Sequence, residues 1–247
     1  MPTESRRRGV AVHRVVMEKI CCEAGVLAPR LLDVEPFSAD AVRSAYGAVA
    51  VDYATTFGDD LARLPLDRDM LDTALAAARG DGWILEAGCG PAPAARYLSD
   101  RAPQLLGVDL SNTMLAVAGA RNPSLRRAQA DIRRLPLRDG CCTLVVAYYS
   151  LQHVPRAELG SAMVELRRVL GDDGLLVMAT HLGDGDVQTD EFLGHRISTV
   201  AGCLYHRQEL IGLLTAAGFR LEDERRRGPL PHEHDSQRIY LLARCDS

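Results

Sequence analysis

The feature that most constrains this chain is a short apolar run that ends in two closely spaced glycines and passes directly into a helix-forming segment. The run reads Ile84-Leu85-Glu86-Ala87-Gly88-Cys89-Gly90-Pro91-Ala92. Glycines at such a turn let the backbone approach a ligand closely, and the free N–H groups at the helix start can hold polar or anionic atoms. A Gly-x-Gly turn alone is a weak signal, so its surroundings decide what it indicates.

Short strand-like and helical segments alternate around this turn. The pattern predicts strands over 83–87, 104–108, 126–130, 143–148, 175–180, 219–225 and 238–243, and helices over 92–101, 111–120, 156–170 and 208–217. Two earlier helices are expected over 38–58 and 67–79, with Ser38 and Asp67 as N-caps. Repeated β-α units of this length predict an α/β fold with an open, largely parallel sheet and helices on both faces.

Two segments depart from the alternation. For residues 1–36 we expect an N-terminal extension that is partly mobile or helical, because their helical periodicity is interrupted by Gly25 and Pro29. Residues 182–205 are polar, contain several glycines and follow a strand, where loops of such sheets form the ligand crevice. We interpret them as a lid or substrate wall, with an inert insertion as the alternative, and expect Asp190, Glu191 or His195 to help select the substrate.

Composition narrows the class of protein. The 247 residues are 47% hydrophobic and 25% charged, with a formal net charge of −4, so a globular domain is expected and a nucleic-acid partner is disfavoured. No stretch approaches the roughly 20 apolar residues that span a bilayer, and no apolar signal segment follows the N-terminal arginines. We therefore expect a cytoplasmic protein without a membrane partner, either a monomer or a homodimer. The seven cysteines lack a C-x-x-C pair and predict reduced thiols.

Three acidic residues follow three successive predicted strands. Glu86 ends the strand before the glycine turn, Asp109 ends the next strand about 20 residues on, and Asp131 follows the third. A carboxylate at the second position typically accepts hydrogen bonds from ribose hydroxyls, and one at the third can accept from an adenine amino group. A nicotinamide dinucleotide site would also use Asp109, but it prefers a third glycine where this chain has Pro93.

Several motifs, in order, resemble those of class I S-adenosylmethionine (SAM) dependent methyltransferases. ILEAGCGPA is similar to the family's first motif, LLGVDLSNTML to the next, QADIRRLP to the adenine-contacting motif and LVVAYYSLQHVP to the fourth strand and its loop. ELRRVLGDDGLLVM and LTAAGF resemble the segments that lead into and form the later strands. The resemblance covers about residues 38–245. It implies a Rossmann-like, seven-stranded, mostly parallel sheet with an N-terminal helical cap.

The resemblance also implies a site. Residues 37–247 would form the methyltransferase domain, with 81–181 as its SAM-binding core. The SAM-contacting positions would be Tyr46, Tyr53, Glu86, Gly88, Gly90, Asp109, Leu110, Met114, Asp131, Ile132 and Tyr148. Where the family often has a third glycine, this chain has Ala92, a mild substitution.

A general base is useful only if the nucleophile must lose a proton, and His153 is the first candidate. It stands in the loop after the fourth strand, where the family contacts substrate, and an unperturbed imidazole titrates near pH 6.5. The alternative is that His153 only orders this loop. His181 and His195 are less clearly placed. The cluster Pro231-His232-Glu233-His234-Asp235 is interpreted as a solvated loop rather than a metal site, so no metal is expected.

The resemblance implies methyl transfer from SAM, with S-adenosylhomocysteine (SAH) as product, to a small-molecule acceptor such as those of secondary metabolism. Two alternatives stay open at this point. One is a protein of this fold that uses the pocket for binding or for non-methylating chemistry. The other is an NAD(P)-dependent oxidoreductase.

Overall fold

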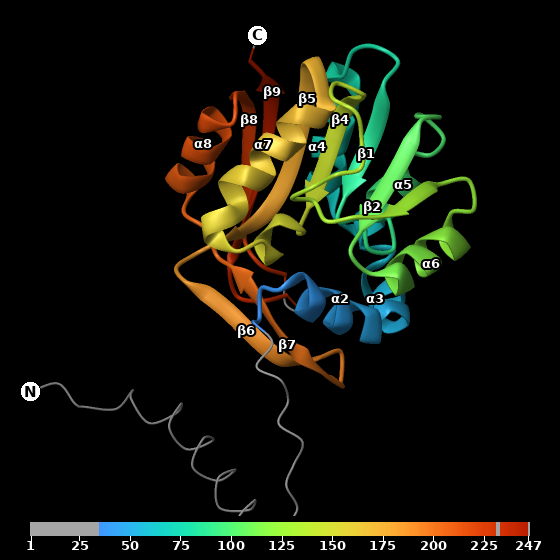
Figure 1. Cartoon of the computed structure of the whole chain (residues 1–247), viewed down its shortest axis with the longest axis vertical. Helices are drawn as coiled ribbons and strands as arrows, with labels where there is room; N and C mark the ends of the chain where they lie inside the picture. The colour runs from blue at the N-terminus through green and yellow to red at the C-terminus, as the bar shows by residue number, and fades with distance from the viewer. Residues whose placement is uncertain (1–34, 231–232, 247) are drawn as a thin grey trace, which may run out of the picture. The chain divides into compact units, whose positions relative to one another are not determined.

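A seven-stranded sheet organises the chain. The computed structural model describes residues 35–230 and 233–246, so the extension expected over 1–36 lies almost wholly outside the described residues. The sheet has the order β3-β2-β1-β4-β5-β9-β8, and only β9 runs antiparallel to its neighbours (Figure 1). Its strands are β1 Trp83–Ala87, β2 Leu105–Asp109, β3 Arg126–Gln129, β4 Cys142–Tyr148, β5 Leu170–Leu182, β8 Phe219–Arg227 and β9 Gln237–Cys245. This confirms the predicted α/β fold with a mostly parallel seven-stranded sheet.

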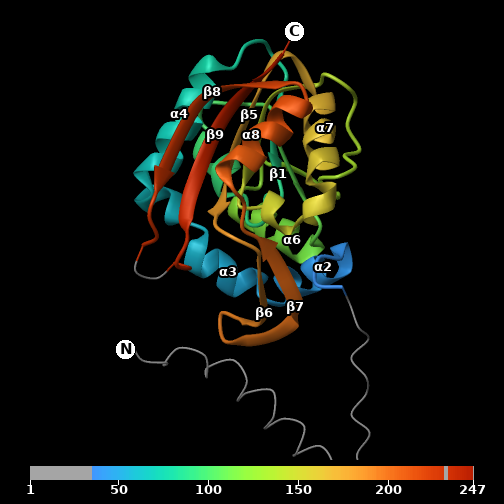
Figure 2. The same cartoon turned by 90° about the vertical axis from the view of Figure 1, so that its left-hand side faces the viewer.

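Helices cover both faces of the sheet, as Figure 2 shows for α7 and α8 on one side and α4 on the other. One buried cluster packs Leu159, Met163 and Leu214 against the sheet, and a second packs Met70, Leu98 and Leu115 against its other face. The helices of the described residues are α2 Ala39–Ala48, α3 Ala50–Phe57, α4 Pro65–Ala77, α5 Pro93–Leu98, α6 Asn112–Arg121, α7 Leu159–Val169 and α8 Arg207–Ala216. Short 3-10 turns are η1 Asp60–Arg63, η2 Leu151–His153 and η3 Arg156–Glu158.

Local sequence explains where two of the helices begin. The Ser38 hydroxyl accepts a hydrogen bond from the Ala41 N–H at 3.1 Å, so Ser38 caps α2 as expected. The prediction that Asp67 caps α4 is wrong. The helix begins two residues earlier at Pro65, whose fixed φ and missing N–H suit a first turn, and Asp67 lies buried within that turn.

Within residues 182–205, where a loop was expected, most residues form a β-hairpin. Strands β6 Asp186–Phe192 and β7 His195–Cys203 pair in antiparallel register, with Phe192 opposite His195. Leu193 and Gly194 form the two-residue turn, with φ of 51° and 77°, the positive values that a tight hairpin turn requires. The hairpin and the α2–α3 segment lie together beyond one end of the main sheet (Figure 1).

Two other features of the described residues bear on the sequence-based expectations. Cys89, Cys141, Cys142, Cys203 and Cys245 are all free thiols. Within residues 35–230 and 233–246, no helix combines the length and apolarity needed to cross a bilayer.

Candidate functional site

One cavity lies at the carboxyl ends of the parallel strands, beneath helices α2 and α3 (the helical segment) and the β6–β7 hairpin. Its volume is about 420 Å³, within the range of small-molecule sites. Its walls contain every residue that the sequence singled out for SAM or for catalysis: Tyr46, Tyr53, Glu86, Gly88, Gly90, Asp109, Leu110, Met114, Asp131, Ile132, Tyr148 and His153. Residues spread over more than 100 positions therefore share one site, because parallel strands end at the same edge of a sheet.

The glycine turn after β1 is tightly built. Gly88 and Gly90 have φ of 70° and 51°, values that side chains rarely adopt. A Cβ at Gly88 would lie 2.3 Å from the Ser150 Cβ, whereas one at Gly90 would have no neighbour nearer than the Met114 sulfur at 4.0 Å. Ala92 is also left-handed, with φ of 58°, a conformation that glycine adopts more easily than alanine. Gly90 thus leaves free space above the backbone for a ligand.

Asp109 ties this turn to the next helix. One carboxylate oxygen accepts from the Gly90 N–H and the other from the Ser111 N–H, both at 2.8 Å. Burial raises the pKa of Asp109, and the two N–H donors act in the opposite direction. Because each oxygen has a second lone pair, the carboxylate can still accept hydrogen bonds from a bound ligand.

The Glu86 carboxylate accepts hydrogen bonds from the backbone at the start of α5, directly after the glycine turn. Its two oxygens accept from the N–H groups of Ala94 and Ala95, at 3.2 and 2.7 Å, in the first turn of α5. Burial raises the pKa of Glu86 to about 8, despite those two hydrogen bonds. Its position in the cavity wall keeps the predicted contact with a ligand amino group open, but its main observed role is to hold the helix start.

Asp131 also lines the cavity, and its carboxylate is already bound by Arg133. Its carboxylate accepts from the Arg133 backbone N–H and Nε–H, each at 2.9 Å. Burial acts to raise the pKa of Asp131, but the Arg133 hydrogen bonds outweigh it and hold the pKa below its usual range. Leu110, Met114 and Ile132 supply apolar surface beside it. Adenine binding by Asp131 stays a prediction, since Arg133 already occupies part of the carboxylate.

His153 is oriented by hydrogen bonds at both ring nitrogens. Its Nδ1 lies 2.8 Å from the Ala201 carbonyl oxygen, which can only accept, so Nδ1 carries the proton. Its Nε2 lone pair therefore faces the Tyr46 hydroxyl, 2.7 Å away, which donates to it. Burial lowers the pKa of His153, and the Ala201 hydrogen bond acts in the other direction. The arrangement holds a neutral imidazole with a basic nitrogen directed at the cavity wall.

An aromatic cluster joins the hairpin to the helical segment. The centroid of the Phe192 ring lies 6.2 Å from the ring centroid of Tyr46, 6.0 Å from that of Tyr53 and 6.3 Å from that of Phe57. Phe192 lines the main cavity, and a second cavity of about 230 Å³ under the hairpin is lined by Val187 and Thr189 among others. The hairpin thus covers the site through apolar side chains.

The three hairpin residues expected to select substrate are placed differently. Asp190, Glu191 and His195 are exposed, and none of them lines either described cavity. His195 instead pairs with Asp52 of α3, with Nε2 and Oδ2 2.6 Å apart. The pairing register of β6 shifts between Thr189 and Glu191, and Thr189 and Phe192 are the side chains of this stretch that line the described cavities. Substrate selection by Asp190, Glu191 or His195 stays a prediction that this geometry does not support.

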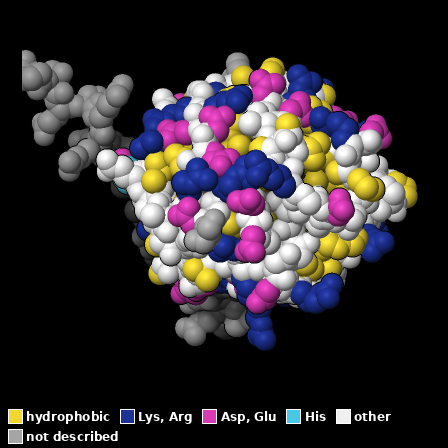
Figure 3. Space-filling model, turned by 90° about the horizontal axis from the view of Figure 1, so that it is seen from above, with side chains coloured by type: hydrophobic (Ala, Val, Ile, Leu, Met, Phe, Trp, Pro, Cys, Tyr) yellow, Lys and Arg dark blue, Asp and Glu magenta, His cyan; other side chains and the backbone are white. Residues whose placement is uncertain are grey.

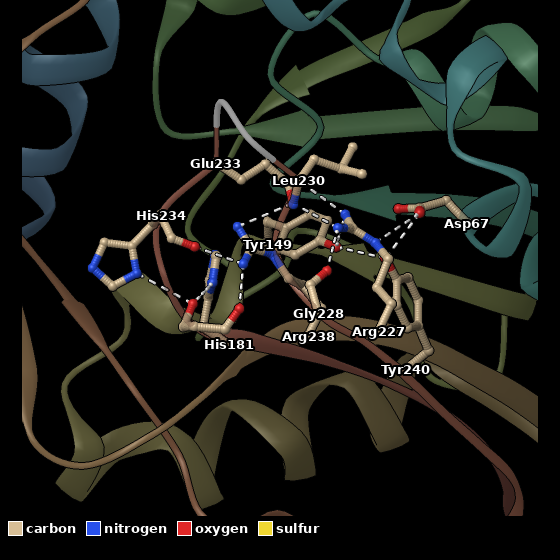
Figure 4. A network of polar contacts seen from close by, with 11 residues as sticks. Asp67, Tyr149, His181, Arg227, Gly228, Leu230, Glu233, His234, Arg238 and Tyr240 are labelled. Carbon is tan, nitrogen blue, oxygen red and sulfur yellow. Dashed lines mark hydrogen bonds and ion pairs between the residues drawn. The ribbon is translucent and has the colours of Figure 1, made fainter.

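The opposite side of the main cavity is lined by Asp67, Tyr149, Arg227, Glu233 and Arg238, which together with the fully buried Tyr240 behind them are called the polar wall (Figure 4). Tyr240 donates to Asp67 at 2.8 Å, and its oxygen accepts from the Arg227 Nε–H at 2.9 Å. Arg227 also binds both oxygens of Glu233, at 2.6 and 2.8 Å. Tyr149 has φ of 54°, an unusual backbone conformation that directs its ring into this network.

The polar wall also settles what Glu233 does in the structure. It is an ion-pair partner of Arg227, and His232, which the sequence analysis placed in the same loop, lies outside the described residues. His181 Nδ1 and His234 Nδ1 both lie within hydrogen-bond distance of the Ser236 hydroxyl, at 2.8 and 3.2 Å.

Sequence reasoning missed most of the polar wall and the aromatic partner Phe192. Two signals were available. Phe192 stands directly before Leu193-Gly194, and glycine at such a position is typical of a hairpin turn. Asp67 follows Pro65, and proline at the first helical position would have placed Asp67 inside the helix. The pairing of Arg227 with Glu233 across a loop has no comparable local signature.

Comparison with known sequences gives a consistent picture. A family model described as a methyltransferase domain matches residues 85–178. The chain is 28% identical over 191 residues to a malonyl-[acyl-carrier protein] O-methyltransferase of Pectobacterium atrosepticum, covering 72% of each chain. It is 33% identical over 149 residues to the malonyl-[acyl-carrier protein] O-methyltransferase of Enterobacter lignolyticus. That match covers 60% of this chain and 57% of the relative, which is less than two thirds of the relative's length.

Comparison with solved structures supports the fold. The chain is similar to the Burkholderia thailandensis 1,6-didemethyltoxoflavin-N1-methyltransferase, a structure with bound 1,6-didemethyltoxoflavin and S-adenosylhomocysteine. The TM-score is 0.62 at 19% identity, with 90% of this chain and 94% of that chain covered.

Proposed function

Because the chain belongs to the class I SAM-dependent methyltransferases, we propose that it transfers the methyl group of SAM to a small-molecule acceptor in the cavity described above. The observation that supports this most directly is the single cavity shared by the glycine turn, Asp109 and the Tyr46–His153 pair. A cavity of about 420 Å³ suits small molecules.

The cavity residues fit SAM. Asp109 offers a half-buried carboxylate with free lone pairs for ribose hydroxyls, and Gly90 leaves open space beside it. Leu110, Met114 and Ile132 form an apolar slot for a planar base. Tyr46 and Tyr53, on α2 and α3, line the end where the family holds the methionine part. In this proposal residues 37–247 form the methyltransferase domain, with 81–181 as its SAM-binding core and 182–205 as its cover.

SAM supplies an activated methyl group on a sulfonium, with a neutral leaving group, so positioning in a dry site accounts for much of the catalysis. The protein contributes three things. The hairpin excludes water through Phe192. Tyr148, held by its hydroxyl on the Asp67 carbonyl oxygen at 3.0 Å, forms a fixed wall after β4. The Tyr46 hydroxyl, which donates to His153 Nε2, takes the proton that a hydroxyl or amine acceptor loses and passes its own proton to Nε2.

Ligand titration tests the proposal. By calorimetry, SAM and SAH should bind and NADH should not, and labelled SAM should yield SAH and a methylated product with a mixture of cell metabolites.

Asp109→Ala should weaken SAH binding about 30- to 150-fold, because two charge-assisted hydrogen bonds are lost. Asp100→Ala, at an exposed position, is the matched control. NADH binding without SAM binding would refute the assignment, and SAH binding without any methylated product would favour a non-methylating use of the site.

A further inference from the structure

Arg238 is a buried cation whose hydrogen bonds are incomplete. It belongs to β9, is 2% exposed and lines the main cavity. Its NH1 donates to the carbonyl oxygens of His234 and Ser236 (Figure 4). Its Nε is buried and has no hydrogen-bond partner among the described residues. Buried polar groups are normally paired, so this N–H calls for an acceptor atom that the described part of the chain does not supply.

The charge of Arg238 is also only partly balanced. Glu233 lies 3.4 Å from its NH2, but the same carboxylate binds Arg227 at 2.6 and 2.8 Å and accepts from the Leu230 N–H at 2.7 Å. The other nearby carboxylate, Asp67, lies on the Arg227 side, 3.9 Å from the Arg227 Nε. Both acids of the polar wall therefore favour Arg227. A buried guanidinium in this situation gains from an additional anionic partner.

The position of Arg238 assigns that partner to the acceptor. Arg238 pairs in register with His181 across β9 and β5, on the side of β4 opposite the glycine turn of β1. A ligand held by Gly90 and Asp109 lies over β1 and β2, so the polar wall faces the other part of the cavity. Tyr149 lies beside His181, with ring centroids 5.4 Å apart, and adds an aromatic surface there.

We infer that Arg238 anchors a carboxylate of the acceptor, so that the substrates are small carboxylic acids; this rests on the proposed methyltransferase function. Arg238 offers one unpaired N–H and one partly balanced positive charge, which a planar anion with a single negative charge would satisfy. Arginine suits carboxylates because its N–H groups lie in the plane of the group that they bind.

The test uses matched pairs of probes that differ in charge. Wild-type protein is first titrated with SAH, and failure of SAH to bind counts against the proposed function rather than against the anchor. The SAH-loaded protein is then titrated with benzoate against benzamide, and with phenylacetate against phenylacetamide. Each acid should bind about 10- to 100-fold more tightly than its amide, as expected for one charge-assisted hydrogen bond. Acids that bind no better than their amides would overturn the inference.

Two variants then locate the effect. Arg238→Gln should abolish the preference for acids while SAH still binds. Arg244→Gln is the control, because Arg244 is another buried arginine of β9, lies outside the cavity and is paired with Glu222. An unchanged acid preference in Arg238→Gln would refute the assignment. If that variant fails to fold, a crystal structure of the wild type with SAH and the preferred acid decides: a carboxylate oxygen within hydrogen-bond distance of Arg238 Nε supports the anchor, and any other position contradicts it.

Discussion

At the scale of single residues, His153 is the group whose role the structure makes most testable. Its Nδ1 donates to Ala201, and its Nε2 accepts from Tyr46. A base acts in its unprotonated form, so the rate should fall as the pH drops through its pKa. Because burial lowers that pKa from 6.5, the acidic limb of the pH–rate profile should lie below pH 6.5.

Substitution separates a base from a residue that only orders the loop. His153→Ala should lower kcat about 10²- to 10⁴-fold if His153 takes the proton. His153→Gln should also remove the acidic limb, whereas Tyr46→Phe, which leaves the imidazole in place, should keep it. If wild type and His153→Gln share the same limb, another group titrates, and His153 serves the structure of the site.

How well the site could be predicted depends on the kind of property in question. The positions of Glu86, Asp109 and Asp131 follow from strand ends, so the sequence was enough to bring them to one cavity. Their partners were not predictable. Glu86 binds the start of α5, and Asp131 binds Arg133, because side-chain geometry decides which of several nearby donors each carboxylate reaches.

At the scale of elements, the β6–β7 hairpin is the part of the fold that departs most from expectation. Its glycines suggested a loop, but Gly194 serves the hairpin turn, and the flanking residues pair as strands. Sequence patterns predicted β1 with its observed bounds and most bounds of the other strands to within two residues, because buried strands have strong apolar patterns. The exception is β5, which begins at Leu170, five residues before the predicted start. A hairpin with mostly exposed side chains has a weak pattern, which explains the error.

Phe192 offers a test of whether this hairpin closes the site. Phe192→Ala removes ring contacts with Tyr46, Tyr53 and Phe57, each worth about 0.5–1.5 kcal/mol. Water should then enter the cavity, so kcat/KM for the acceptor should fall about 10- to 100-fold while the Kd for SAH changes less than about threefold. Steady-state kinetics and calorimetry measure the two quantities.

The control for this prediction lies on the same strand. Gln188 is exposed and lines neither of the two described cavities, so Gln188→Ala should leave both quantities at wild-type values. Loss of SAH binding in Phe192→Ala equal to its loss of kcat/KM would show that the ring supports SAM rather than the closure over the acceptor.

At the scale of the whole described domain, the charged side chains of the surface differ from those of the polar wall. Figure 3 shows one face, on which Lys and Arg side chains are interspersed with Asp and Glu. Exposed pairs such as Arg43–Asp40 contribute little to stability. The polar wall differs, because Asp67 on α4, Arg227 on β8 and Tyr240 on β9 are joined below the surface. It therefore links a covering helix to the edge of the sheet.

Two carboxylates of this wall should make opposite contributions to stability. Burial raises the pKa of Asp67 to about 6, against its hydrogen bond from Tyr240 and the charge of Arg227. Burial also acts on Glu233, but the Arg227 hydrogen bonds outweigh it and lower its pKa to about 2. Stabilisation by the Asp67 proton is fully present below its unfolded pKa of 3.8 and is lost as the pH rises through about 6. Stabilisation by ionised Glu233 is present above its unfolded pKa of 4.5 and is lost as the pH falls toward about 2.

Neutral variants of the two residues should consequently shift the free energy of unfolding in opposite directions. At pH 7, Asp67→Asn should increase it by about 1–3 kcal/mol, because the amide keeps an acceptor for Tyr240 without a buried charge. The difference from wild type should disappear below about pH 4. Glu233→Gln should decrease it by about 1–3 kcal/mol at pH 7, because Arg227 and Arg238 lose their shared counter-ion, with the difference shrinking toward pH 2. Urea unfolding at several pH values measures both. A less stable Asp67→Asn at pH 7 would mean that its attraction to Arg227 exceeds the cost of burying its charge, and the polar wall would then be a stabilising ion-pair network throughout.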